Sequence, residues 1–191
     1  MSVIRFLREF ALNPATTGAI APSSSYLARE MVAGLDLQRA HAVLEYGPGT
    51  GAFTGFVLER LPPSCRFLAI EMNPQFHREL SDRFPQATVH NGSVADIREI
   101  CDNYGIASAD CVISGLPWAA FSDDAQRRYI DAMMTVLKPG GQFVTFCYYH
   151  SLLIPAARRF AATLPRYFSE IRRSRIVWAN VPPAFVYRCR R

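Results

Sequence analysis

The chain has 191 residues, of which 50% are hydrophobic, and its 21 Lys and Arg against 16 Asp and Glu give a formal net charge of +5. This length and composition allow one globular domain with a proper core and exclude a disordered chain. No stretch has the roughly 18 consecutive apolar residues of a membrane span, and the first residues lack a signal-peptide cleavage pattern. The basic excess favours partners that carry phosphate, without choosing between nucleic acid and lipid headgroups.

The five cysteines form no C-x-x-C pair, and their odd number argues against a zinc site or a disulfide framework. We therefore expect no metal and a reducing, cytoplasmic location. The protein is expected to be soluble, or at most attached to a surface.

The first 35 residues are expected to form a helical extension of a single domain that spans 1–191. Within 2–12, apolar residues recur at helical spacing, at Val3, Phe6, Leu7 and Phe10. Arg5 and Arg8 fall on another face. This pattern fits a helix that lies on an anionic membrane surface, and it fits a helix packed on the core equally well.

From residue 42 onward, apolar runs alternate with helical patterns. The runs predict strands at 42–46, 66–71, 87–90, 110–114 and 142–148. Helical spacing predicts helices at 53–61, 74–84 and 123–137, the last with Ser122 as its N-cap. This β-α-β series predicts an α/β fold with a mostly parallel sheet and helices on both faces. The end of the chain predicts two strands around a turn at Pro182 and Pro183, which should form an antiparallel hairpin at one edge of the sheet.

A glycine-rich turn follows the first predicted strand in "AVLEYGPGTG", with Gly47, Gly49 and Gly51 at alternate positions. Missing Cβ atoms allow a tight turn and close approach of a ligand to the backbone. Glu71 ends the second predicted strand, where such folds offer a carboxylate to ribose hydroxyls. Glu45, two residues ahead of the turn, would repel a pyrophosphate and suits a cationic amino-acid group. The alternative is a glycine turn with an incidental glutamate.

The segments "VLEYGPGTG" and "AIEMNP" resemble the class I S-adenosylmethionine-dependent methyltransferases, over about residues 40 to 150. The resemblance implies a Rossmann-like fold and S-adenosylmethionine, which becomes S-adenosylhomocysteine, with no metal. It implies that the glycine loop holds the methionine part, that Glu71 binds the ribose and that the end of the third strand contacts the adenine. The cofactor-binding residues implied in this way are Glu45, Gly47, Gly49, Thr50, Gly51, Glu71, Met72, Gly92, Ser93, Val94 and Ser114.

Two segments depart from the family's usual pattern. In "VHNGSVAD", Ser93 stands where relatives often have an acid, so the resemblance leaves the adenine contact to a backbone amide or to Val94. In "ISGLPW", residues 113–118, Ser114 or Gly115 stands where amino-directed methyltransferases carry the asparagine of N-P-P-Y. Losing that amide argues against a nucleic-acid base as substrate. Trp118 would still shape an amine pocket, unless it simply caps the core.

The chain as a whole resembles the soluble bacterial phospholipid N-methyltransferases, on "FLREFALNPATTGAIAPSSSYLAREM", "LEYGPGTG", "GLPW" and "VWANVPPAFVYRCRR". This resemblance implies conversion of phosphatidylethanolamine to phosphatidylcholine by a monomer that is peripheral on the inner face of the cell membrane. The segment "ATTGAIAPSSSYLA" is also similar to one in ribosomal RNA adenine dimethylases, but there is no room for their helical RNA-binding domain. An adenine N6-methyltransferase of ribosomal RNA and a non-catalytic S-adenosylmethionine-binding module remain the alternatives.

The methyl acceptor site is expected to be aromatic, because ring faces attract the quaternary ammonium that forms. Its candidate residues are Tyr26, Trp118, Tyr148, Tyr149 and, as a base, His150. From Arg158 to Arg191 there are nine arginines and one acid, Glu170, which predicts a surface that faces phosphates or a solvated basic face. A lipid phosphate is expected to bind there, at Arg172, Arg173 or Arg175.

Overall fold

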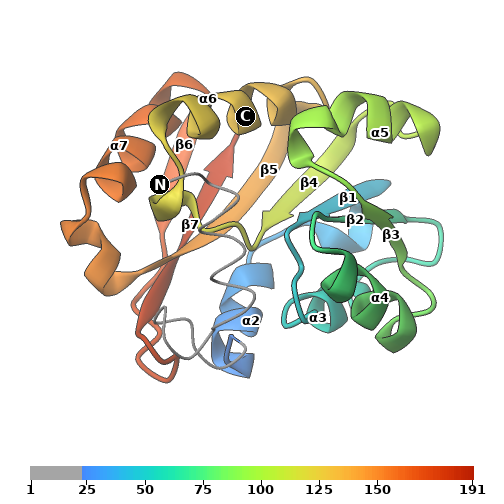
Figure 1. Cartoon of the computed structure of the whole chain (residues 1–191), viewed down its shortest axis with the longest axis horizontal. Helices are drawn as coiled ribbons and strands as arrows, with labels where there is room; N and C mark the ends of the chain where they lie inside the picture. The colour runs from blue at the N-terminus through green and yellow to red at the C-terminus, as the bar shows by residue number, and fades with distance from the viewer. Residues whose placement is uncertain (1–22) are drawn as a thin grey trace.

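The computed structural model describes residues 23–191, so the expected surface helix at 2–12 lies outside the described residues. One seven-stranded sheet runs through the molecule in the order β3-β2-β1-β4-β5-β7-β6 (Figure 1). Its strands are β1 (Ala42–Tyr46), β2 (Arg66–Glu71), β3 (Thr88–Asn91), β4 (Ala109–Ser114), β5 (Leu137–Tyr148), β6 (Glu170–Arg173) and β7 (Ala184–Arg190).

The first five strands are parallel, and β7 is antiparallel to both of its neighbours. The carboxyl ends of β1 to β5 therefore meet at one edge of the sheet, together with the chain that leads into β7. The mostly parallel sheet and the antiparallel C-terminal hairpin at its border are confirmed. Parallel order also explains why the loops after β1, β2 and β4 can share one site.

Helices cover both faces of the sheet, with α5, α6 and α7 on one face and α2, α3 and α4 on the other (Figure 1). Successive side chains of β1 point to opposite faces of the sheet. Leu44 and Tyr46 pack in the core under α5, α6 and α7, and Val43 packs in the core under α2, α3 and α4. The helices are α2 (Ser25–Val32), α3 (Thr54–Leu58), α4 (Pro74–Arg83), α5 (Ile97–Asn103), α6 (Asp123–Met134) and α7 (Pro155–Thr163). Short 3-10 helices lie at Leu37–Arg39, Val94–Asp96, Trp118–Ala120, Tyr149–Leu153 and Leu164–Arg166.

The structure departs from the predicted elements in four places, the first of which is the helix predicted at 53–61, which spans only Thr54–Leu58. Helices α5 and α7 were not predicted, because each is short and buries only a few side chains, such as Ala157 and Phe160 in α7. The predicted helix at 123–137 ends at Met134. Strand β5 begins at Leu137, ahead of the predicted start at 142, since Leu137 pairs with Ala109 of β4 and the strand continues past Gly140, whose φ is +72°.

Helix α2 is held against the sheet by polar contacts at both of its ends. The Arg188 guanidinium on β7 donates to the carboxylate of Glu30 at 2.6 Å. The Ser24 hydroxyl caps the helix, and the Ser24 backbone N–H donates to Oδ1 of Asn180 at 2.9 Å. The start of α2 is thereby tied to the chain that precedes β7. Within residues 23–191, no helix has the length and apolar character to cross a membrane.

Candidate active site

The glycine loop after β1 contains three glycines with positive φ, at +62° for Gly47, +55° for Gly49 and +79° for Gly51. A Cβ on Gly47 would lie 2.7 Å from Cδ2 of Leu116, and one on Gly51 would lie 2.6 Å from Cε2 of Phe84. A Cβ on Gly49 would meet nothing within 4 Å. Gly47 and Gly51 are therefore required by packing, whereas Gly49 borders open space that a ligand can enter.

Glu71, at the end of β2, fixes the shape of this loop. Its Oε2 accepts a hydrogen bond from the Gly49 N–H at 3.0 Å, and its Oε1 accepts one from the Asn73 N–H at 2.8 Å. Burial raises the pKa of this carboxyl, and the bonds from Asn73 and Gly49 oppose that shift. Each carboxylate oxygen can still accept a further hydrogen bond. Glu71 therefore joins two loops and keeps capacity for a ligand.

Glu45 lies on the inner side of the loop and is fully buried. Its Oε2 accepts a hydrogen bond from the Thr54 hydroxyl at 2.8 Å, and its Oε1 has no partner among the described residues. Burial raises its pKa to about 8; the Thr54 bond lowers it, and the nearby Glu71 charge raises it further. The contact that the structure shows for Glu45 is thus with the first residue of α3, and the carboxylate is not open to solvent.

The end of β3 packs against the end of β2. The Asn91 side chain donates to the Glu71 carbonyl at 2.8 Å, and the Gly92 N–H donates to the same oxygen at 3.2 Å. The Ser93 hydroxyl accepts from the Ala95 N–H at 3.2 Å, so it caps the next turn. The Val94 side chain is buried in the core. Met72, in contrast, is 46% exposed directly after Glu71 and is free to contact a ligand.

Ser114 and Trp118 brace the loop after β4. The Ser114 hydroxyl accepts from the indole N–H of Trp118 at 3.1 Å, and both side chains are buried. The indole stacks on Phe160 with ring centroids 4.7 Å apart and an interplanar angle of 17°. This placement favours the alternative that Trp118 caps the core, because its ring is enclosed by core side chains.

A row of aromatic rings connects the glycine loop to the end of β5. Phe53, just after the glycines, packs edge-on against Phe146 at 5.7 Å, and Phe146 packs edge-on against Tyr148 at 5.3 Å. Tyr148 stacks on His150 at 5.7 Å. Burial raises the pKa of Tyr148, whereas His150 is exposed. The structure thus brings Tyr148 and His150 together, while Tyr26 lies 59% exposed in the first turn of α2.

The three candidate phosphate-binding arginines differ in their surroundings. Arg172 forms an ion pair with Glu170, and the guanidinium of Arg173 lies 5.0 Å from the ring centroid of Tyr187. Arg175 is exposed and has no ion pair within the part of the chain that the structure describes. Among the described residues, Arg175 is therefore the one of the three whose guanidinium has neither an ion pair nor an aromatic ring beside it.

Several site residues were missed in the sequence. The Thr54 hydroxyl donates a hydrogen bond to Glu45, and the Asn73 backbone N–H donates one to Glu71. Phe146 completes the aromatic row. A Cβ on Gly115 would lie 2.5 Å from the Gly47 carbonyl oxygen, so the loops after β1 and β4 touch there. The Asn-Pro pair at 73–74 is an N-cap signal that could have identified Asn73. The contacts of Phe146 and Gly115 depend on tertiary packing.

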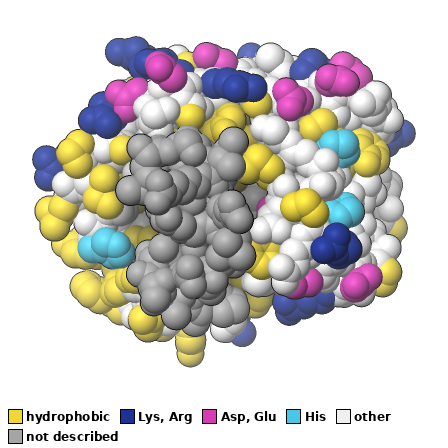
Figure 2. All heavy atoms as spheres, viewed as in Figure 1, with side chains coloured by type: hydrophobic (Ala, Val, Ile, Leu, Met, Phe, Trp, Pro, Cys, Tyr) yellow, Lys and Arg dark blue, Asp and Glu magenta, His cyan; other side chains and the backbone are white. Residues whose placement is uncertain are grey.

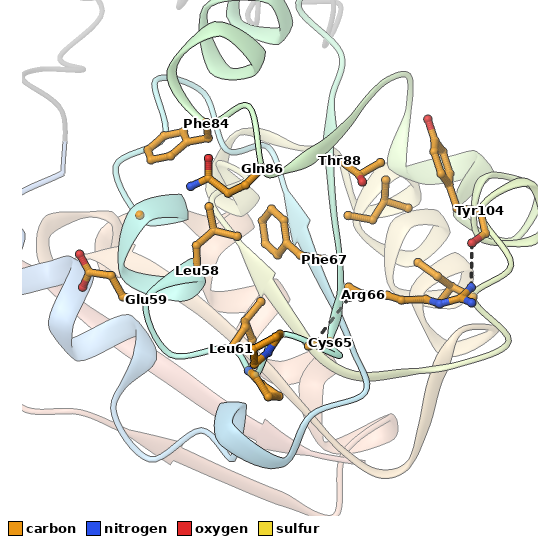
Figure 3. A pocket seen from close by; sticks show the side chains of 15 residues that line it. Leu58, Glu59, Leu61, Cys65, Arg66, Phe67, Phe84, Gln86, Thr88 and Tyr104 are labelled. Carbon is orange, nitrogen blue, oxygen red and sulfur yellow. Dashed lines mark hydrogen bonds between the residues drawn. The ribbon is translucent and has the colours of Figure 1, made fainter.

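A cleft of about 690 Å³ opens at the other end of strands β2 and β3, between α3 and Tyr104 (Figure 3). Its Arg66 guanidinium donates to the carbonyl oxygens of Tyr104 and Gly105, at 3.1 and 2.6 Å. Burial raises the pKa of the Cys65 thiol to about 11, which keeps it protonated and unreactive. This cleft is lined by the amino-terminal residues of β2 and β3 and is therefore remote from the carboxyl ends of the strands. Within residues 23–191, no group of three or more His, Cys, Asp or Glu is placed to hold a metal ion.

Comparisons with known proteins agree with this geometry. Residues 43–141 match the family model described as a methyltransferase domain. Over 188 residues, the chain is 33% identical to the ornithine lipid N-methyltransferase of Singulisphaera acidiphila. The aligned region covers 97% of this chain and 94% of that protein.

Two solved structures share the fold. The O-methyltransferase of Bacillus cereus in complex with S-adenosylhomocysteine has a TM-score of 0.70 at 12% identity, covering 100% of this chain and 92% of that chain. The O-methyltransferase TomG of Streptomyces achromogenes, solved with S-adenosylmethionine, has a TM-score of 0.68 at 18% identity, covering 96% and 88%. Together with the glycine loop and the two acidic residues beside it, these matches show that the chain belongs to the class I S-adenosylmethionine-dependent methyltransferases.

Proposed function

We propose that this protein transfers methyl groups from S-adenosylmethionine to the amine of phosphatidylethanolamine and of its methylated intermediates, and so makes phosphatidylcholine. The observation that carries the proposal is the 33% identity, over 97% of the chain, to an enzyme named for N-methylation of a lipid. The enzyme would act as a monomer on the inner face of the cell membrane. The proposal also accounts for the aromatic edge beside the glycine loop and for the basic C-terminal region.

The residues around the glycine loop suit the three parts of S-adenosylmethionine. The methionine part would lie over Gly49, where open space borders the backbone, with Gly47, Thr50 and Gly51 shaping the turn. The ribose hydroxyls would donate to the remaining lone pairs of Glu71. The adenine would pack on the exposed Met72, beside the backbone of 92–94. Glu45 would lie beneath the cationic end, where its Oε1, which has no partner among the described residues, could accept a hydrogen bond. Ser114 would support the loop from below.

S-adenosylmethionine, when bound, supplies a methyl group already activated by a sulfonium. The lone pair of the lipid amine forms the new N–C bond as the S–C bond breaks, and S-adenosylhomocysteine is the leaving product. The first two transfers each release one proton from nitrogen, and the third releases none. The protein must align the neutral amine, exclude water and accept those protons. His150 would accept the proton, because its ring is stacked on Tyr148 and exposed to solvent.

The acceptor nitrogen becomes a cation, which an aromatic face stabilises. We place that nitrogen beside Tyr148, with the exposed Tyr26 of α2 on the same edge of the sheet. The phosphate of the headgroup would bind Arg175, whose guanidinium has no ion pair among the described residues. Arg172 and Arg173 would contribute positive charge to the same region.

Ornithine lipid is a second candidate substrate, because the 33% identical relative is named for it. The test uses S-adenosylmethionine labelled on its methyl group, with phosphatidylethanolamine, ornithine lipid and ribosomal RNA offered separately. The proposal expects label in phosphatidylethanolamine. Label in ornithine lipid alone would move the activity to the second candidate, and label in RNA alone would support the adenine methyltransferase alternative.

A further inference from the structure

Large apolar side chains stand exposed at the edge of the sheet that carries the candidate site. They come from two segments, 149–154 after β5 and 178–181 before β7. Leu153 is 76% exposed, Val181 is 75% exposed and Trp178 is 67% exposed. We call this set the edge patch; its members are Tyr149, Leu153, Ile154, Trp178 and Val181. Contiguous apolar exposure of this kind marks an interaction surface more often than it occurs by chance.

The two segments form one surface. The Tyr149 N–H donates to the Pro183 carbonyl at 2.8 Å, and the rings of Tyr149 and Trp178 lie 6.0 Å apart. Tyr148, at the end of β5, pairs with Ala184 at the start of β7. Figure 2 shows hydrophobic side chains gathered on the lower left of the molecule, in the region of these chain segments in Figure 1. The patch therefore continues directly from the aromatic row that ends at Tyr148 and His150.

The charge around the patch is positive. Arg158 is exposed on α7, where its Nε donates to the Leu152 carbonyl at 2.8 Å, and Arg175 is exposed three residues before Trp178. Glu170 is the one acid between 149 and 191, and it pairs with Arg172. Tryptophan and tyrosine favour the membrane–water interface, where the ring is apolar and its polar group remains wet. Exposed aliphatic residues with flanking arginines thus match an anionic bilayer in both polarity and charge.

We propose that the edge patch docks on the interfacial region of an anionic phospholipid bilayer and so presents the acceptor site to lipid headgroups. This inference rests on the proposed lipid N-methylation and adds the surface by which the described domain meets its substrate. Val181 neighbours Asn180, whose side chain holds the start of α2 through Ser24. Docking through the patch would therefore bring Tyr26 and Tyr148 to the same face of the bilayer.

The two tryptophans of the chain make a direct test possible, because Trp178 is exposed and Trp118 is buried. Vesicles of phosphatidylcholine and phosphatidylglycerol, with and without brominated acyl chains, would be mixed with the full chain. Docking predicts a blue shift of tryptophan emission and quenching by the brominated lipid. The Trp178→Phe protein, which retains only Trp118, should show neither change. Vesicle binding without quenching of Trp178 would overturn the proposal and place the membrane contact elsewhere.

A second pair of variants measures affinity. The double variant Leu153→Ser with Val181→Ser should partition at least about tenfold more weakly into these vesicles, since two exposed aliphatic side chains lose their burial. Tyr104→Ser is the matched control, because Tyr104 is also exposed but lies at the remote cleft, and it should bind vesicles like the wild type. Unchanged binding of the double variant would refute docking through the patch.

Two controls separate this proposal from its alternatives. Methylation of a short-chain phosphatidylethanolamine below its critical micelle concentration tests the proposed function without a bilayer, and the double variant should retain it. If the wild type fails in that assay, the proposed function fails, whatever the vesicle result. Sedimentation velocity tests a second copy as the occupant: a wild-type dimer that the double variant converts to a monomer would assign the patch to self-association and contradict the membrane proposal.

Discussion

The backbone N–H of Gly49 donates to Oε2 of Glu71 across 3.0 Å, which joins the loop after β1 to the end of β2. The same carboxylate also accepts from the Asn73 N–H at 2.8 Å, at the N-terminus of α4. Glu71 is thus a structural link between two loops and, under the proposed function, the acid that would bind the ribose. Its replacement should affect the fold and the cofactor together.

We predict that Glu71→Gln weakens S-adenosylmethionine binding by about ten- to a hundredfold. Hydrogen bonds to a charged group contribute about 1.5 to 3 kcal/mol, and an amide cannot accept at both of its ends. Calorimetric titration measures the effect. Glu59→Gln, on an exposed side chain at the end of α3, serves as the matched control and should bind normally. Equal affinity of Glu71→Gln and wild type would place the ribose elsewhere.

Substitutions of two glycines in the loop should have different effects, one on cofactor affinity and the other on the free energy of unfolding. Gly49→Ala adds a Cβ into open space at a φ of +55°, so it should mainly obstruct the cofactor, with about 1 to 2 kcal/mol of backbone strain. Gly51→Ala drives its Cβ to within 2.7 Å of Leu80 and should mainly lower the free energy of unfolding. Titration and denaturant unfolding on both proteins distinguish them. A stable Gly51→Ala protein with lost binding would contradict this assignment.

Glu45 should make stability depend on pH in a defined direction. Its pKa rises from an ordinary value of 4.5 to about 8 in the folded protein. The folded protein therefore binds more protons than the unfolded chain between these values, and the Glu45 contribution to stability falls as pH rises through the interval. Glu45→Gln should lose less stability than the wild type across that interval. Thermal unfolding at several pH values tests this, and parallel curves for the two proteins would contradict it.

Substitution of Tyr148 should lower activity toward the lipid acceptor without changing the affinity for S-adenosylmethionine. Tyr148→Ala removes a ring that would face the methylated ammonium, a contact of about 0.5 to 2 kcal/mol, so kcat/KM for the lipid should fall about two- to thirtyfold. Tyr148→Phe keeps the ring face and should restore most of the activity. Steady-state kinetics with titration of S-adenosylmethionine measure both. If Tyr148→Ala and the wild type had equal activity, Tyr148 would not be part of the acceptor site.

Trp118 should stabilise the loop after β4. Ser114→Ala leaves the buried indole N–H of Trp118 without an acceptor, which costs about 1 to 3 kcal/mol of unfolding free energy. Urea unfolding measures this loss. A direct role in amine binding would instead appear as a raised KM in a protein of unchanged stability.

The sequence predicted the parallel sheet, its C-terminal hairpin and the glycine loop because each has a local signal. Val and Ile runs, alternate glycines and an acid at a strand end all lie within a few residues of one another. It left open whether Trp118 shapes an amine pocket or caps the core, and it did not predict that the Glu45 carboxylate is directed to Thr54. Those outcomes depend on which face of the sheet each side chain meets and on helix α7, whose pattern is too short to recognise.

The most direct test of the account is to locate the transferred methyl group. The protein would be incubated with S-adenosylmethionine that carries a deuterated methyl group and with phosphatidylethanolamine, and the extracted lipids would be analysed by fragmentation mass spectrometry. We predict deuterated methyl groups on the headgroup nitrogen, in the mono-, di- and trimethylated lipids. Methyl groups on oxygen, or unlabelled lipid beside labelled RNA in a parallel incubation, would contradict the proposed lipid N-methylation.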